Sequence, residues 1–352
     1  MPYELPPDPS TERRTRVTRW VSFAFAATLV ALVTYLAYVG YEGSRQLSDP
    51  PGRSSDCRTP ATFGWSYEAI NYDIADDAAL GAEADPRQCS RQGVAAGDAV
   101  EAGGIGLAGW YVPAANGAGP TGPTVVLAHG WGSNKSAMLD RAALLHDAYN
   151  LLLVDLRNHG QSAQAPTTQG VREADDLRAM IDWLEREKGP DRIAVLGVSM
   201  GGVTALAEAD RDERVDAIIA ESIHATLANA AQARLDGAGY PLSMPGSWAI
   251  LLGALIRTGE DVSAVDPVQS VRRLDERPVL LIEGGADGSI GVGDADALLE
   301  AAEKGGSPTE LHVCPNAGHG VSNDVCAEEY AAWVLGFLER ALAPAGEALH
   351  RP

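Results

Sequence analysis

The chain has 352 residues, 45% of them hydrophobic, and a formal net charge of −21. This length and hydrophobic content suit one large globular domain with additional segments, or two small domains. The acidic balance argues against nucleic acid as a partner, because phosphate binding requires a basic surface. An acidic surface of this kind mainly favours solubility, and no internal repeat is visible.

The N-terminal 41 residues have the composition of a membrane anchor. Residues 1–19 end in an arginine cluster, and residues 20–40 read WVSFAFAATLVALVTYLAYVG without a charge. About 20 apolar residues cross a bilayer, and aromatic residues lie near both ends of this stretch. We predict a cytoplasmic tail over 1–19 and a transmembrane anchor over 20–41, with a buried core helix or a cleaved signal peptide as alternatives. The positive-inside rule then places the N-terminus in the cytoplasm and the rest of the chain outside the cell membrane.

Residues 42–60 are rich in serine, proline and glycine, which indicates a flexible linker before a domain over 61–345. Four cysteines follow the apolar stretch, and an even number in an exported segment suggests disulfides. The pairing of nearest neighbours, Cys57–Cys89 and Cys314–Cys326, is our expectation, and four unpaired thiols are the alternative. No C-x-x-C or His-rich cluster occurs, so we expect no structural metal, and the chemistry below requires no cofactor.

Apolar runs alternate with helical periodicity through the rest of the chain. Such alternation predicts an α/β fold with a mostly parallel sheet covered on both faces. The first two expected strands, 65–74 and 105–112, are antiparallel. The later strands are expected at 124–128, 150–154, 193–198, 215–220, 278–283 and 309–313, with helices around 138–145, over 173–188, after residue 199 and over 327–342.

Residues 192–209 read as strand, sharp turn and helix, with Gly197-x-Ser199-x-Gly201 at the turn. Such a serine sits in a strained backbone conformation, and side chains two residues away would collide with the strand and helix that it joins. The pattern is short enough to arise by chance in a chain with 38 glycines. In this strand–turn–helix context, however, it predicts that Ser199 is a nucleophile.

A nucleophilic serine needs a base and a group that orients the base. His319 lies in a small-residue loop, Asn316-Ala-Gly-His-Gly320, just after the last expected strand. Asp287 follows the preceding strand, although Asp155 and Glu221 also end strands and are alternative acids. The order Ser199, Asp287, His319 is that of the α/β-hydrolase triad.

The sequence resembles the α/β-hydrolase superfamily, and within it the serine-aminopeptidase-like and acyl-hydrolase branch. The matching segments, spread over residues 65–342, are Gly106–Pro113, Leu127–Trp131, Asp155–Ser162, Gly197–Gly201, Asp287 and Gly318–Gly320. The resemblance implies an oxyanion hole formed by the backbone N–H groups of Trp131 and Met200. Met200 would open a helix, where free N–H groups and the helix dipole favour an anion.

These residues predict a membrane-anchored serine hydrolase that cleaves a carboxylic ester, or a related acyl bond, through an acyl-enzyme. The alternatives are a serine peptidase of the same fold, in which Glu221 could hold a substrate ammonium group, and a non-catalytic surface module. The expected partners are a small-molecule or lipid-like acyl substrate and the lipid bilayer, while the oligomeric state is not predicted.

An insertion over 222–277 lies where this superfamily carries lids. It contains the apolar run Trp248–Ile256, which could be a helix packed on the sheet. Alternatively, Trp248, Leu251, Leu252 and Leu255 line an acyl pocket or face the bilayer.

Overall fold

The computed structural model of the chain describes residues 9–51, 54–73, 78–79, 105–117 and 119–343. Its centre is a twisted sheet with the strand order β2-β1-β3-β5-β4-β6-β7-β8-β9. The strands are β1 (Glu68–Asp73), β2 (Ala78–Ala79), β3 (Gly106–Val112), β4 (Thr124–Ala128), β5 (Asn150–Asp155), β6 (Ile193–Val198), β7 (Val215–Glu221), β8 (Val279–Gly284) and β9 (Thr309–Cys314). Strands β4 to β9 pair in parallel, whereas β1, β2 and β3 form an antiparallel edge.

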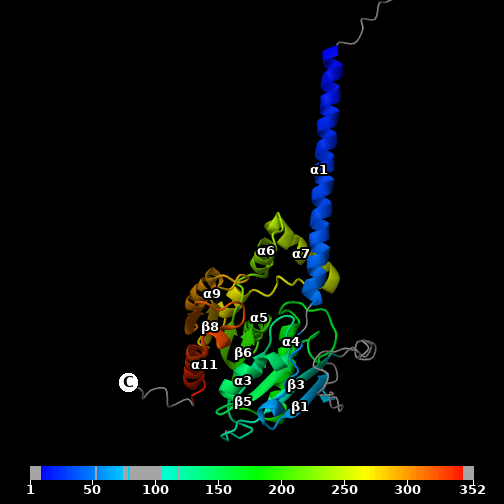
Figure 1. Ribbon diagram of the computed structural model, residues 1–352. Coiled ribbons are helices and arrows are strands. Elements are labelled where there is room, and N and C mark those ends of the chain that lie inside the picture. The colour runs from blue at the N-terminus through cyan, green and yellow to red at the C-terminus, as the bar shows by residue number, and fades with distance from the viewer. Residues whose placement is uncertain (1–8, 52–53, 74–77, 80–104, 118, 344–352) are drawn as a thin grey trace, which may run out of the picture.

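Helices cover both faces of this sheet (Figure 1). One face packs against α3 (Leu139–Leu145) and α11 (Ala327–Ala341). The other packs against α4 (Glu173–Glu187), α5 (Met200–Ala209), α8 (Pro267–Arg272) and α9 (Val292–Gly305). A hydrophobic core lies on each face of the sheet, and successive residues of a strand point into opposite cores. In β6, for example, Val195 packs on one face while Ala194 and Leu196 pack on the other.

The predicted α/β fold is confirmed, and every predicted strand is present within a few residues of its expected bounds. Both faces of β4, β6 and β8 are buried, which explains their largely apolar sequences, whereas the edge strand β9 is mostly half-buried. Helix α9, between β8 and β9, was not predicted. The short elements η1 (Pro60–Phe63), η2 (Lys135–Met138) and α10 (Ser322–Val325) complete the connections around the sheet.

A single helix, α1 (Pro9–Ser48), extends far from the body of the molecule (Figure 1). The part from Arg16 onward is long and apolar enough to cross a membrane. The expectation of a flexible linker from residue 42 is wrong for residues 42–48, which continue the helix and pack against the insertion. Ser44 is buried at this contact, because serine is small enough to lie between closely packed helices, whereas the carbonyl oxygen of the buried Ser48 accepts from the Thr167 N–H at 2.9 Å.

The insertion over 222–277 folds into α6 (Leu227–Gly237), α7 (Ser243–Thr258) and α8. Helices α6 and α7 stand above the sheet beside the C-terminal turns of α1 (Figure 1). The contact between α1 and α7 is close: a Cβ at Gly40 would lie 2.7 Å from the carbonyl oxygen of Ala249. The small residues of both helices therefore allow their backbones to approach directly.

Candidate active site

Ser199 lies at the sharp turn between β6 and α5, with φ of 54° and ψ of −120°. The two flanking glycines are required by close backbone approach. A Cβ at Gly197 would lie 2.3 Å from the carbonyl group of Gly201, and one at Gly201 would lie 2.2 Å from the Ala128 oxygen. The turn therefore matches the strained serine predicted from the sequence.

His319 and Asp287 meet Ser199 above the carboxyl ends of the parallel strands. The His319 Nε2 lies 2.8 Å from the Ser199 Oγ, and its Nδ1 lies 2.7 Å from the Asp287 Oδ2. The other Asp287 oxygen accepts hydrogen bonds from the Ser289 and Ile290 N–H groups, at 2.8 and 3.1 Å. Burial would raise the pKa of Asp287, but the hydrogen bonds from His319 and these amides together hold it below its usual value.

The two residues predicted for the oxyanion hole lie next to Ser199. Met200 is the first residue of α5, so its N–H has no acceptor within the helix. Trp131 follows Gly130, whose hypothetical Cβ would lie only 3.3 Å from the Ser199 Cβ. The neighbouring Gly132 N–H donates to the His159 Nε2 at 2.9 Å, which fixes this loop. The arrangement can place two donors beside an oxygen bound near Ser199.

A cavity of about 450 Å³ opens beside these residues. Ser199, Met200, Trp131 and His319 are among the residues that line it. Its walls come from α6, which contributes Leu227, Ala231, Arg234 and Leu235, and from α1, which contributes Tyr38, Val39, Glu42, Gly43, Gln46 and Leu47. The volume lies in the range of small-molecule sites.

A buried ion pair supports the loop that carries His319. The Arg141 guanidinium binds the Glu221 Oε2 through two nitrogens, at 2.7 and 2.9 Å, and donates to the Gly320 carbonyl oxygen at 2.9 Å. The Tyr330 hydroxyl donates to the same Glu221 oxygen at 3.0 Å. The Ser222 Oγ accepts from the Gly320 N–H at 3.0 Å. The residue after His319 is thus held on both its N–H and its carbonyl group.

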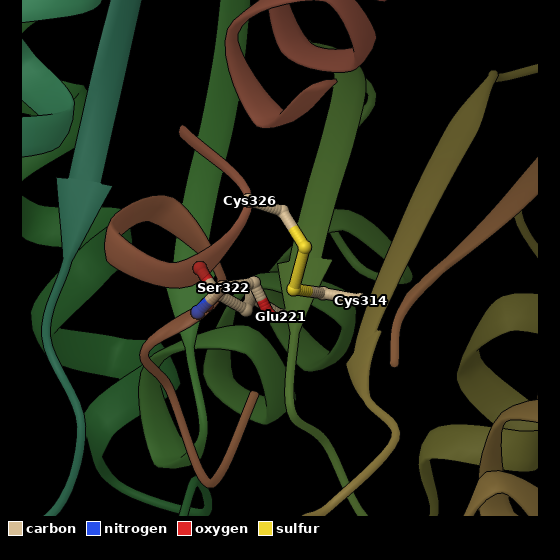
Figure 2. The surroundings of a disulfide bond; sticks show 4 residues. All are labelled: Glu221, Cys314, Ser322 and Cys326. Carbon is tan, nitrogen blue, oxygen red and sulfur yellow. A yellow bond between two sulfur atoms is a disulfide. The ribbon is translucent and has the colours of Figure 1, made fainter. Parts of the chain in front are cut away.

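The predicted disulfide Cys314–Cys326 is confirmed. It closes a segment of the chain that contains His319, and Figure 2 shows it near Glu221 and Ser322. The Ser322 N–H donates to the Glu221 Oε1 at 3.2 Å, so the crosslink and the ion pair restrain the same loop. Cys89 lies outside the described residues, and the pairing Cys57–Cys89 stays a prediction.

Removing this disulfide by the double substitution Cys314→Ser and Cys326→Ser is expected to lower the free energy of unfolding by about 3 kcal/mol. The unfolded chain loses a short crosslinked loop and gains entropy. Chemical denaturation under non-reducing conditions measures the change. An unchanged free energy of unfolding would contradict a structural role for the crosslink.

His129 and the alternative acid Asp155 both have structural partners. His129 is fully buried, with its Nδ1 2.8 Å from the Gly130 oxygen and its Nε2 accepting from the Leu156 N–H. Burial and the neighbouring His159 lower its pKa to about 3, so it stays neutral. Asp155 accepts from the Lys135 and Gln161 N–H groups and pairs with the Lys135 ammonium. It therefore secures its own loop, as expected if it is not the acid of the triad.

Glu221 is likewise unsuited to a substrate ammonium group. Its side chain is fully buried, and both carboxylate oxygens accept the hydrogen bonds from Arg141, Tyr330 and Ser322. A buried carboxylate with these partners has no exposed oxygen to offer to a ligand.

Glu283, at the end of β8, is a buried carboxyl that the sequence analysis did not identify. Its Oε1 accepts from the Ile223 N–H at 3.2 Å, and its Oε2 has no hydrogen-bond partner among the described residues. Burial, together with the carboxylates of Asp287 and Asp294, raises its pKa from 4.5 to about 9, although the Ile223 N–H opposes this. Glu283 is therefore neutral in the folded protein at pH 7.

Glu283→Gln is expected to stabilise the protein progressively as the pH rises from about 5 to about 8. In this window the unfolded chain has Glu283 ionised while the folded protein keeps it protonated, so the wild type loses stability with rising pH. Glutamine removes this dependence, and the difference in unfolding free energy should grow by about 1 kcal/mol per pH unit. Urea unfolding of both proteins across this range measures it; parallel pH profiles would contradict the assignment.

The apolar run of the insertion is confirmed as a helix, α7, but the four residues expected as a possible acyl-pocket lining, Trp248, Leu251, Leu252 and Leu255, do not line the cavity. Leu251 packs inside the insertion against Leu227 and Ala254. Trp248, Leu252 and Leu255 point to the exterior, with 60%, 58% and 42% of their surface exposed. Among α7 residues, the cavity is lined by Ile250.

Helix α1 contributes to the cavity, which the sequence did not lead us to expect. Tyr38, Glu42 and Gln46 recur every fourth residue, which places them on one face of a helix. That spacing was present in the sequence, but residues beyond 41 read as a linker because of their serines, prolines and glycines. Within the described part of the chain, no cluster of His, Cys, Asp or Glu side chains could hold a metal ion.

Comparisons with known proteins agree with this architecture. The model of the family described as alpha/beta hydrolase fold matches residues 123–254. The uncharacterized protein YqkD of Bacillus subtilis is 31% identical over 224 residues, which cover 61% of this chain and 71% of YqkD. YfhR of Escherichia coli K12, also uncharacterized, is 27% identical over 249 residues, or 68% of this chain and 79% of YfhR.

Solved structures show the same fold. The Pyrococcus furiosus esterase Pf2001 superposes with a TM-score of 0.64 at 23% identity, over 84% of this chain and 98% of the esterase. The α/β hydrolase GrgF from a Penicillium species superposes with a TM-score of 0.55 at 21% identity, over 79% of this chain and 99% of GrgF.

Proposed function

The chain belongs to the α/β-hydrolase superfamily, and on this premise we propose that it is a membrane-anchored serine hydrolase that cleaves carboxylic esters through an acyl-enzyme. The observation that carries the proposal is the continuous chain of hydrogen bonds from Asp287 through His319 to Ser199. The similarity to an esterase structure supports the fold that holds these groups. Ester specificity and the serine mechanism are parts of the proposal.

Each group has a role that follows from its position. The His319 Nε2 accepts the proton of Ser199 as the Oγ attacks the ester carbonyl, and the Asp287 carboxylate stabilises the imidazolium that forms. The depressed pKa of Asp287 keeps it ionised at neutral pH, as this role requires. The same imidazolium then protonates the leaving alcohol, and His319 activates the water that releases the acyl group.

The N–H groups of Trp131 and Met200 stabilise the negative charge on the carbonyl oxygen in both steps. Such donors are effective because they are fixed before the charge develops. Here Met200 is held by the helix that it opens, and the loop of Trp131 is tied by the Gly132–His159 hydrogen bond and by the indole N–H of Trp131, which donates to the Leu47 oxygen at 3.0 Å.

We propose that α1 remains attached as the membrane anchor, with the N-terminus cytoplasmic and the hydrolase domain outside. Its apolar side chains between Trp20 and Val33 are solvent-exposed, as expected for a segment that is covered by lipid. Its last turns are buried in the fold, where Val39 and Ser44 are 3% and 1% exposed. Cleavage after the apolar span would leave a gap beside α7, which supports an anchor over a signal peptide.

A panel of p-nitrophenyl esters of increasing chain length beside aminoacyl-nitroanilides tests the reaction class. Hydrolysis of the esters, with labelling of the protein by a fluorophosphonate, is the expected result. Because Glu221 is occupied by Arg141, Tyr330 and Ser322, we expect slow or no cleavage of the aminoacyl-nitroanilides. Peptide substrates cleaved faster than every ester would favour the peptidase, and a folded protein without labelling would favour a non-catalytic module.

A further inference from the structure

We propose that α7 and the loop preceding it lie in the surface layer of the bilayer that α1 crosses, and that the substrate is a long-chain acyl ester entering the cavity from the lipid. This inference rests on the proposed hydrolase function and adds a substrate class and a route of entry to it. Four observations on α1, α6 and α7 carry it.

First, the anchor forms part of the cavity. Tyr38, Glu42 and Gln46 of α1 line the same space as Ser199 and His319. A helix that served only as a tether would have no side chains in the site. The cavity therefore begins at the point where α1 leaves its apolar span, and a molecule held in the lipid beside α1 is adjacent to it.

Second, the tip of the insertion reaches back along the apolar span. The Tyr35 hydroxyl donates to the Pro241 carbonyl oxygen at 2.5 Å, in the loop between α6 and α7. Tyr35 lies six residues before Tyr41, or about 9 Å along the helix at ~1.5 Å per residue. The loop is therefore beside residues that we assign to the bilayer, and its exposed side chains Tyr240 and Leu242 are suited to that depth.

Third, the outer face of α7 is an apolar stripe. Met244, Trp248, Leu252 and Ile256 recur every fourth residue and are 55%, 60%, 58% and 78% exposed. The opposite face of α7 is also apolar and packs against α1 and the insertion. No charged residue occurs in α7 before Arg257. Water is a poor solvent for a helix that is apolar on both faces.

Fourth, the polar boundary of α7 coincides with that of α1. The Arg257 guanidinium lies 5.2 Å from the centre of the Tyr41 ring, and Tyr41 and Glu42 mark the end of the apolar span. Aromatic and cationic side chains of this kind gather at the membrane surface. The apolar stripe continues the lipid-facing surface of α1, so one bilayer covers both, and this continuity identifies lipid as the partner of the stripe.

The close backbone contact fixes this arrangement. A Cβ at Gly253 would lie 2.6 Å from the Gly40 carbonyl oxygen, so α7 cannot move away from α1 without losing a tightly packed interface. The insertion is thus held at one depth by the anchor. A substrate whose acyl chain lies in the lipid can enter with its chain between α6 and α1 and its ester group at Ser199.

The test uses the full chain in phosphatidylcholine vesicles with two esters: p-nitrophenyl acetate in the water and p-nitrophenyl palmitate in the vesicles. The triple variant Trp248→Gln, Leu252→Gln and Ile256→Gln makes the stripe polar without touching the cavity. We expect its rate on the palmitate to fall about tenfold or more, and its rate on the acetate to stay near that of the wild type. The matched control is Leu335→Gln, an exposed apolar residue on α11, which should leave both rates unchanged.

An unchanged palmitate rate in the triple variant would overturn the proposal, and so would an equal loss on both esters. A wild type that hydrolyses neither ester would instead refute the proposed function. For that reason a second measurement tests the membrane contact without catalysis. In a Trp20→Phe background, brominated phosphatidylcholine should quench Trp248, and Trp248→Phe should remove that part of the quenching; equal quenching in both proteins would overturn the membrane contact.

Discussion

Replacing Ser199 by alanine is expected to lower kcat for ester hydrolysis by about 10⁴-fold or more. The substitution removes the Oγ that lies 2.8 Å from the His319 Nε2, and with it the covalent step. The fold should persist, because the strained turn is set by the backbone contacts of Gly197 and Gly201 rather than by the hydroxyl. Labelling by a fluorophosphonate should disappear with the activity.

The matched control for Ser199→Ala is Ser263→Ala, which removes the hydroxyl of an exposed serine outside the cavity lining. It should keep wild-type turnover and labelling. If Ser199→Ala turned over esters at near the wild-type rate, another nucleophile would be responsible, and the assignment of Ser199 would be wrong. Residual activity well above that of water alone is still expected, because the Trp131 and Met200 donors remain.

The candidate site could be predicted largely because its residues follow strands. Parallel strands end at one edge of the sheet, so side chains directly after β6 and β8 lie close together whatever the order of the strands. Ser199 and Asp287 occupy such positions, and His319 lies five residues after the end of β9. The glycines on either side of Ser199 are a second signal in the sequence. The structure gives the reason for them, because a Cβ at Gly197 or Gly201 would collide with neighbouring backbone atoms.

The cavity walls could not be predicted in the same way, because they depend on contacts between distant segments. Nothing in the local sequence of residues 38–47 indicates that they pack against α7, some 200 residues later. Gly43 and Ser44, two of the small residues that suggested a linker, lie at this close helix contact. Composition alone does not separate a flexible segment from a small-residue interface, and only the tertiary arrangement decides between them.

The buried ion pair between Arg141 and Glu221 supports the loop that carries His319. Arg141→Met is expected to lower the free energy of unfolding by about 3–5 kcal/mol, because it leaves the Glu221 carboxylate buried without a counter-charge. The side chains of Arg141 and Glu221 are 6% and 0% exposed, so water does not replace the lost partner. Ester hydrolysis should also decline, since the Gly320 carbonyl loses its donor next to His319. Thermal or urea unfolding measures the first effect, and kcat measures the second.

The double variant Arg141→Met and Glu221→Gln separates charge burial from packing. With the carboxylate removed, the unpaired charge disappears, and much of the lost stability should return, because a neutral pair avoids the cost of burying an ion. The kcat should not recover with it, since the hydrogen bond to the Gly320 oxygen is still absent. Recovery of both quantities would mean that Arg141 acts on the His319 loop only by neutralising Glu221. Recovery of neither would mean that the guanidinium stabilises the fold mainly through its contacts with Tyr330 and Gly320.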